Sequence, residues 1–428
     1  MIKKFEKQYL AHHEELQRLQ WSNYFEGSKH DLSGLDEEIY NLVCSFADRI
    51  DASSRRGRVA DLIIRRELVD KHPSISKLRN RIDDLTNYDA GIPLEVRDDG
   101  YKYQLEMARR MKDDVLQLMH LRDSVAAEHG YSSYVDLVLA DNELDRGELL
   151  LLLNQFVDRN IHKAGEVKRK YNITFENWFD DLAAVSQIDT SYCPDRLIDD
   201  LLGMLGFLEV GKQMTIHYIT DGFSGYAVEF SRDDIRVAVK PIESLDGLRS
   251  LFHEIGHGVF YSLNEESGLF RILPASLNEA MAVVFEYIAA FLLLDGDVRE
   301  KTYELMTLEY TRCAISALFE FDLWENPHMA EALYERHYSK LGLKISDPSI
   351  WSFDSFRSID PVYIHNYVVG ASIAERLILY LNDLYSDDYG AWGSWLAHKI
   401  FREGSRRTVR EMGLLRLGSN SFKFYQKS

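Results

Sequence analysis

The sequence predicts a mostly helical protein with one small β-sheet, and two observations support this fold class. Over most of the chain, apolar residues recur at three- and four-residue steps between charged ones, the spacing of amphipathic helices. Three such stretches are residues 1–25, 35–70 and 101–128. From about 214 to 241 the pattern changes to alternating β-branched and aromatic residues. We expect strands at 215–220, 226–230 and 235–240, and another helix from about residue 245.

Composition restricts the possible partners. The chain has 428 residues, with 50 basic and 69 acidic side chains and a formal charge of −19. Such an acidic surface repels nucleic acid and anionic membranes, and no apolar run approaches the roughly 20 residues of a membrane helix. The start of the chain lacks the apolar core of a signal peptide. We therefore expect no nucleic-acid or membrane partner, a cytoplasmic location, and a monomer or homodimer.

The cysteines give no indication of a disulfide framework or a zinc knuckle. There are three, widely spaced in the sequence: Cys44, Cys193 and Cys313. We expect all three to be buried as small apolar residues, which is the commonest environment of a free cysteine. A reducing compartment fits this usage.

The segment LRSLFHEIGHGVF contains the motif H-E-x-x-H, formed by His253, Glu254 and His257. On a helix the two histidines share one face and can bind one metal ion, while Glu254 can reach a water on that ion. The surrounding residues are apolar, so this helix is expected to be largely buried. Buried histidines and a buried carboxylate are costly unless something satisfies them, and a zinc ion would do so.

A zinc hydrolase needs a third protein ligand and one open position. The next helix, LNEAMAVVFEYIAAF, contains Glu279 and Glu286, which lie two turns apart on one face. We expect Glu279 to be the third ligand and Glu286 to orient a ligating histidine. The two roles could also be exchanged. Ser276 and Asn278 are expected to cap this helix.

Several stretches carry a family resemblance. HEIGH followed by SLNEAMAVVFE resembles the zinc peptidases of the thimet oligopeptidase and oligoendopeptidase F family, in which a Glu ligand follows H-E-x-G-H. Further similar stretches are GFSGYAVEF, LRDSVAAEHGYSSYVDL and DPVYIHNYVVGASIAERL. Peptidyl-dipeptidases of the angiotensin-converting-enzyme type are more distant relatives. The resemblance covers about residues 120–380.

The resemblance implies an architecture of two helical lobes around a deep substrate groove, with the small sheet next to the active-site helix. Residues 1–110 would form part of the lobe that covers the groove, and residues 111–428 the catalytic region. One Zn²⁺ per chain would be bound by His253, His257 and Glu279, with Glu254 as general base.

Hydrolysis of an amide also needs donors for the developing oxyanion. By resemblance, Tyr363 and Tyr367 match two tyrosines of the family and would supply these donors. His365 lies where the family usually has another tyrosine, and Arg357 lies near a position where it usually has a histidine. We therefore expect His365 to act in catalysis and Arg357 to contact substrate, although core packing is the alternative for all four.

Gly225 and Tyr226 would belong either to an edge strand that binds a peptide by strand addition or to an ordinary hairpin turn. The predicted function is hydrolysis of short, unstructured peptides. One alternative is a carboxydipeptidase, which needs a cation for the terminal carboxylate; Lys240, Arg271 and Arg357 are candidates. Another alternative is a catalytically silent peptide-binding protein.

Overall fold

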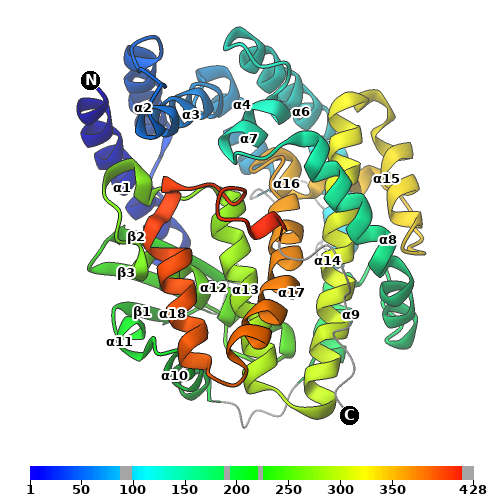
Figure 1. Ribbon diagram of the computed structural model, residues 1–428. Helices are drawn as coiled ribbons and strands as arrows, with labels where there is room; N and C mark the ends of the chain where they lie inside the picture. Colours follow the sequence, from blue (N-terminus) through cyan, green and yellow to red (C-terminus); the bar gives the residue numbers. More distant parts are fainter. Residues whose placement is uncertain (87–98, 188–192, 220–224, 417–428) are drawn as a thin grey trace. The chain divides into compact units, whose positions relative to one another are not determined.

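The structure is a computed structural model that describes residues 1–86, 99–187, 193–219 and 225–416 (Figure 1). It divides into two compact units, each built from three chain segments. Unit 1 comprises Met1–Asp189, Glu243–Asp246 and Gly296–Val368, and unit 2 comprises Thr190–Ile242, Gly247–Asp295 and Val369–Ser428.

The boundaries of these units differ from those of the domains expected at residues 1–110 and 111–428. Helix α6 (Gly100–Glu128) crosses the expected boundary at residue 110 and packs against α4 (Pro73–Thr86). Unit 1 also includes the later helices α8 (Arg146–Lys170) and α14 (Gly296–Glu325), which pack along each other. The predicted division into a covering region and a catalytic region stays a prediction.

Within the described residues, unit 1 is helical. Besides α4, α6, α8 and α14 it contains α1 (Ile2–Phe25), α2 (Ser33–Phe46), α3 (Arg55–Asp70), α7 (Tyr134–Asp141), α9 (Trp178–Val185), η2 (Pro327–Met329), α15 (Ala330–Ser339), η3 (Pro348–Phe353) and α16 (Ser355–Ser358).

Unit 2 combines helices with the sheet. It contains α10 (Pro194–Met204), α11 (Leu208–Gly211), β1 (Met214–Tyr218), β2 (Gly225–Ser231), β3 (Asp234–Val239), η1 (Gly268–Arg271), α13 (Ala275–Leu293), α18 (Tyr389–Lys399), η4 (Phe401–Arg406) and η5 (Leu414–Arg416). Two helices begin in unit 1 and continue into unit 2, namely α12 (Leu245–Leu263) and α17 (His365–Tyr385).

The helices begin where the local sequence supplies a cap. Asp99 accepts a hydrogen bond from the backbone N–H of Lys102 at the start of α6, and Ser133 accepts one from Asp136 at the start of α7. The helical stretch expected over 35–70 is interrupted, because α2 ends at Phe46 and Ser54 caps α3. At the start of α3 the backbone is so close that a Cβ on Gly57 would lie 1.9 Å from the Asp51 carbonyl oxygen.

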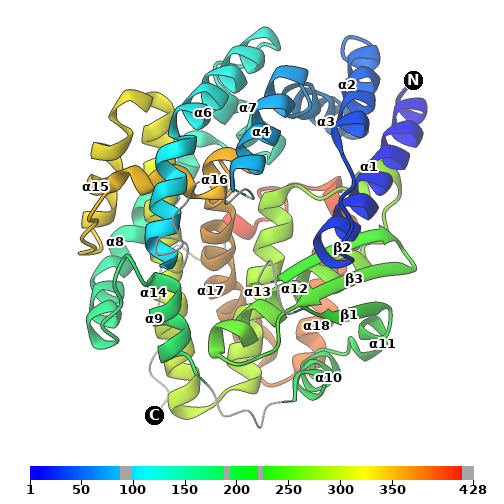
Figure 2. The same cartoon turned by 180° about the vertical axis from the view of Figure 1, so that it is seen from behind.

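The mostly helical fold with one small sheet is confirmed. The sheet has three strands in the order β1-β3-β2, with β1 parallel and β2 antiparallel to β3. All three predicted strands are present within two residues of their expected ends, although residue 220 lies outside the described residues. In both views the strands lie beside α12 (Figure 2). A Cβ on Gly258 of α12 would meet the Met214 side chain at 2.3 Å, so helix and sheet are in close contact.

The core of unit 2 is built around α13, in which every residue from Glu279 to Ala290 is buried. The stretch Gly268–Leu293 contains an 18-residue window with a mean hydropathy of 1.5, so by length and composition it could cross a membrane. The expectation that no stretch approaches this length was therefore wrong. However, 78% of its apolar window is buried inside the protein, as in the core helix of a globular unit.

The cysteines differ from expectation in part. Cys313, on α14, is buried as predicted. Cys44 and Cys193 are exposed, so the prediction was wrong for these two. Cys44 faces solvent on α2, whose buried face is formed by other positions such as Ile39 and Val43.

Candidate metal centre

A stripe of polar side chains runs along α12 at intervals of four residues: Arg249, His253, His257 and Tyr261. This spacing places the four side chains on one face of the helix. The same helix approaches α13 closely at Gly256, where a Cβ would lie 2.9 Å from both the Cα of Ala282 and the Cβ of Phe285. Because residue 256 is glycine, the two helices can pack closely enough for side chains from both to come into contact.

The three predicted ligands converge there. The Nε2 atom of His253 lies 3.1 Å from Glu279 Oε2, and the Nε2 atom of His257 lies 3.7 Å from Glu279 Oε1. The two Nε2 atoms are 3.2 Å apart. All candidate ligand atoms of His253, His257 and Glu279 lie within 4.8 Å of one another. Two nitrogens and one carboxylate are a donor set that suits zinc.

Hydrogen bonds at the far side of each ring fix how the imidazoles are presented. Nδ1 of His253 is 2.7 Å from Glu286 Oε1, and Nδ1 of His257 is 3.0 Å from Asn278 Oδ1. Asn278 Nδ2 in turn donates to the Tyr261 hydroxyl at 3.0 Å. Glu286 Oε1 and Asn278 Oδ1 are both hydrogen-bond acceptors, so the Nδ1 atom of each ring carries a proton. The two Nε2 atoms therefore face each other and Glu279. This arrangement fits a cation between them.

Burial and neighbouring charges shift the pKa values of the acidic and basic side chains in this cluster. Burial alone would lower the pKa of His253, but hydrogen bonds and charge from Glu279 and Glu286 outweigh it and hold that pKa well above the usual value. For His257 burial dominates and lowers the pKa to about 4. Burial raises the pKa of Glu254 to about 8, the direction expected of a group that must both take and return a proton near neutral pH.

Glu254 is 8% exposed and lies against the start of β2. A Cβ on Gly225 would meet Glu254 Cγ at 2.5 Å and Oε1 at 2.8 Å, so any larger residue there would displace the carboxylate. Of the two alternatives for Gly225 and Tyr226, the structure shows the strand, since both belong to β2, an edge strand of the described sheet. Peptide binding at this edge stays a prediction.

The structure brings Glu286 to His253, as the sequence-based hypothesis proposed, and adds three residues that it missed. Neither Ser276 nor Asn278 caps α13, because its N-cap position is Pro274 and it has no side-chain cap. Asn278 accepts the hydrogen bond from His257 instead. Arg249 Nε lies 3.5 Å from Glu286 Oε2. Arg249 and Tyr261 could have been found from the sequence, because each is four residues from a motif histidine.

Unit 1 contains the three residues of the C-terminal motif that were predicted to act in catalysis, namely Tyr363, His365 and Tyr367. The ring of Phe356 stacks on Tyr363 at 5.7 Å between centroids, and Tyr363 and Tyr367 are 5.9 Å apart. His365 is 1% exposed, and its Nε2 has no hydrogen-bond partner among the described residues. Burial lowers the pKa of His365 to about 3, so the ring is neutral. The catalytic roles of all three stay predictions.

The predicted substrate contact of Arg357 finds no support in its surroundings. Its side chain is 1% exposed, and its guanidinium lies 3.1 Å from Glu320 Oε2 and donates to the Ser316 hydroxyl. Arg271, another candidate for a terminal carboxylate, is also engaged internally, with Glu229 and the Asn264 carbonyl. Both cations therefore have partners inside their own units.

Comparisons with known proteins show the fold. No protein-family model and no curated protein sequence matches the chain. Among solved structures, a carboxypeptidase from Deinococcus radiodurans aligns with a TM-score of 0.65 at 11% identity over 97% of this chain and 94% of its own. PZ peptidase A aligns with a TM-score of 0.68 at 14% identity over 91% and 82%.

Metallocarboxypeptidase 1 of Trypanosoma cruzi gives a TM-score of 0.63 at 14% identity over 97% and 95% of the two chains. The chain has the fold of these peptidases. A structure described as an oligoendopeptidase F also aligns, with a TM-score of 0.67. The fold expected from the family resemblance is thus shared with both endopeptidases and carboxypeptidases, although sequence identity is low throughout.

Proposed function

We propose that the protein is a zinc metallopeptidase that hydrolyses short, unstructured peptides. The observation that carries this proposal is the convergence of His253, His257 and Glu279, with both imidazoles held by hydrogen bonds on their far sides. When bound, zinc would activate a water molecule for attack and polarise the scissile carbonyl. One ion per chain and a cytoplasmic location are further predictions.

The residues of the chain supply the proton transfers. Glu254 takes a proton from the attacking water and later gives it to the nitrogen of the leaving amine, so the C–N bond breaks without releasing an amide anion. Burial beside β2 keeps this carboxylate in a fixed place and raises its pKa to about 8. Tyr363 and Tyr367 are the proposed donors to the carbonyl oxygen, on the basis of the family resemblance alone.

Carboxypeptidase activity is a second candidate, because two of the similar structures are described as carboxypeptidases and align over nearly the whole of both chains. This activity requires a cation for the terminal carboxylate of the substrate. Arg271 and Arg357 have internal partners, and Lys240, which follows β3, is the remaining candidate from the sequence.

The test is hydrolysis of a mixed library of short peptides, followed by mass spectrometry, with bound metal measured in parallel. We expect Glu254→Gln to lower the rate roughly 100- to 10,000-fold while zinc stays bound. Glu265→Gln is the matched control, because it makes the same chemical change on a side chain that is 65% exposed. Chelated wild type should be inactive and regain activity with zinc.

The fragment lengths decide between the candidates. Internal cuts indicate an endopeptidase, whereas stepwise loss of one or two C-terminal residues indicates a carboxypeptidase. Equal rates for wild type and Glu254→Gln, or a purified protein that binds no metal at all, would contradict the proposal.

A further inference from the structure

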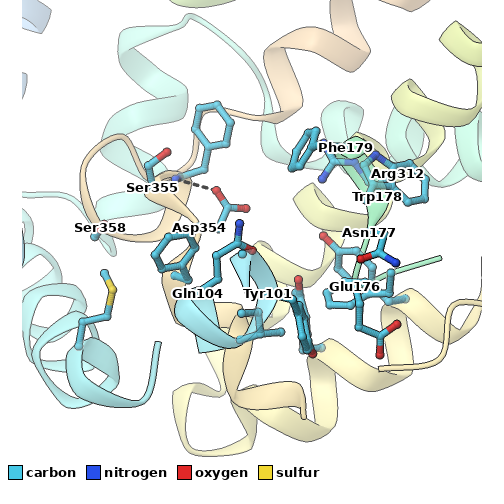
Figure 3. A pocket seen from close by; sticks show the side chains of 18 of the residues that line it. Tyr101, Gln104, Glu176, Asn177, Trp178, Phe179, Arg312, Asp354, Ser355 and Ser358 are labelled. Carbon is cyan, nitrogen blue, oxygen red and sulfur yellow. Dashed lines mark hydrogen bonds between the residues drawn. The ribbon is translucent and has the colours of Figure 1, made fainter. Parts of the chain in front are cut away.

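Unit 1 contains a cavity of about 700 Å³ that the proposed chemistry does not use (Figure 3). It is formed by the start of α6, the segment leading into α9, and parts of α14, α15, η3 and α16. Aromatic rings form much of its wall, including Tyr101, Phe175, Trp178, Tyr334 and Phe356. A volume of several hundred Å³ with aromatic walls is typical of sites for organic ligands.

The rim of the cavity exposes apolar side chains. Phe179, at the second position of α9, is 68% exposed, and Ile359 is 38% exposed. Both line the cavity. Large apolar side chains that lie in water around a concave site are a feature of ligand-binding surfaces.

The charges on the wall are mainly negative. Among the described lining residues, five are carboxylates and one is a guanidinium: Asp83, Asp99, Glu176, Asp180, Asp354 and Arg312. The guanidinium is already neutralised, because Arg312 donates from Nε to Glu309 Oε2 at 3.1 Å and from Nη2 to Oε1 at 2.5 Å. Two of the five carboxylates also have cation partners, because Asp99 lies 2.7 Å from Lys102 and Asp354 lies 3.5 Å from Arg357. Negative charge still exceeds positive charge on the wall, so the cavity favours a positively charged occupant and repels an anion.

The positions of these groups suit an elongated cation. Figure 3 shows Asp354 and Gln104 on one side of the cavity and Trp178, Phe179 and Arg312 on the other. The indole of Trp178 is fixed by a hydrogen bond from Nε1 to Glu309 at 3.0 Å. Asp354 accepts a backbone hydrogen bond from Phe356, which holds its carboxylate in place. A cation with an extended apolar stem can meet carboxylates and aromatic faces together.

We propose that this cavity binds the basic side chain of a peptide, arginine or lysine. Arg312 already lies over the rings of Trp178 and Phe179, at 5.6 and 5.8 Å from their centroids. The other rings of the wall, such as Tyr101 and Phe175, attract such a cation together with the carboxylates, and the apolar stem packs on them. A hydrated inorganic cation would gain little from the aromatic wall. That the bound peptide is also cleaved rests on the proposed function, whereas binding itself does not.

The test is calorimetric titration of the Glu254→Gln protein with two short peptides blocked at both ends. The peptides differ only in one residue, arginine in one and its neutral isostere citrulline in the other. We expect the arginine peptide to bind at least about tenfold more tightly, equivalent to about 1.4 kcal/mol. This preference should weaken as salt is raised.

Two variants locate the site. Asp354→Asn removes the charge and keeps the oxygen that accepts from the Phe356 N–H, and Glu176→Gln removes a second charge from the wall. Together they should abolish the preference for arginine. Asp158→Asn, on the exposed face of α8, removes the same type of charge elsewhere in unit 1 and should leave the preference unchanged. If Asp354→Asn lowers the melting temperature, Glu176→Gln alone is used.

Equal binding of the two peptides would overturn the proposal, as would a preference that survives in both cavity variants. The titration is repeated after zinc is removed with a chelator, and the preference should persist. A protein that shows this preference but cleaves nothing would contradict the proposed function alone. A protein that cleaves peptides without the preference would contradict the cavity site alone.

Discussion

Buried carboxylates are neutralised in different ways in the two units. In unit 1, Glu320 lies 3.1 Å from Arg357, and Asp36 is bound by Arg79 at 2.7 Å and by Lys71. In unit 2, Glu279 and Glu286 lie 3.1 and 2.7 Å from the nitrogens of His253. Arginine and lysine stay charged at neutral pH, whereas an imidazole can lose its proton. The cations of the unit 1 pairs are therefore permanently charged, although burial raises the pKa of Glu320 to about 7. In unit 2, Arg249 lies 3.5 Å from Glu286, but the main partner of both carboxylates is an imidazole, which would lose its proton on binding a metal ion.

The largest effect is expected where a buried carboxylate loses its permanently charged partner. Arg357→Ala leaves Glu320 buried without its cation, and we expect the free energy of unfolding to fall by about 3–5 kcal/mol. Unfolding in urea measures this. Glu320→Gln added to the same variant should restore part of the loss. A loss that the second change does not reduce would indicate a packing effect of Arg357 instead.

Removal of metal tests the exchangeable cluster. An ion that binds only the folded state at about 100 times its dissociation constant adds about 2.7 kcal/mol to the free energy of unfolding. A chelator should therefore lower the melting temperature of the wild type. His257→Ala, which lacks one of the three proposed ligands, should show little response to the chelator. A similar response in both proteins would mean that the ion binds elsewhere.

His365 provides a smaller, pH-dependent effect in unit 1. Its folded-state pKa of about 3 lies below the ordinary value of 6.5. Its contribution to stability is thus present above pH 6.5 and is lost as the pH falls toward 3. The loss should reach about 2 kcal/mol by pH 5. His365→Leu should flatten this part of the stability profile; an unchanged slope would show that the ring is accessible to protons when folded.

The smallest effect concerns the two different partners of the histidines proposed as ligands. His257 is held by the neutral amide of Asn278, and His253 by the carboxylate of Glu286. We expect Asn278→Ala to weaken zinc binding roughly tenfold. Competition with a chelator dye measures this affinity, and Glu286→Gln, which removes a charge as well, should weaken it more. The reverse order would argue that the charge of Glu286 is not felt at the metal.

The convergence of His253, His257 and Glu279 was predictable because its information is local in the sequence. The four-residue step of His253 and His257 and the seven-residue step of Glu279 and Glu286 each follow from helix geometry. Asn278 was misassigned, since an asparagine near a helix start looks the same whether it caps the helix or binds a side chain on another helix.

The features that depend on distant contacts could not be predicted. The cavity in unit 1 combines residues from Ile82 to Ile364, and no periodic pattern connects its wall. Likewise the ion pair of Arg357 joins α16 to Glu320 of α14, which lies 37 positions earlier in the chain. Sequence spacing predicts which residues are neighbours within one helix or strand, but it does not predict which helices and strands will pack together.

The complete burial of α13 from Glu279 to Ala290 affects how the metal centre would behave over long times. A helix with one face in water can fray or open locally, whereas a helix surrounded by core opens only when most of its unit does. The backbone amides of this stretch should therefore be among the slowest in the protein to exchange with deuterium. The carboxylate of Glu279 would then stay in place for as long as unit 2 stays folded, so an ion would leave by exchange of its ligands rather than by breathing of the helix.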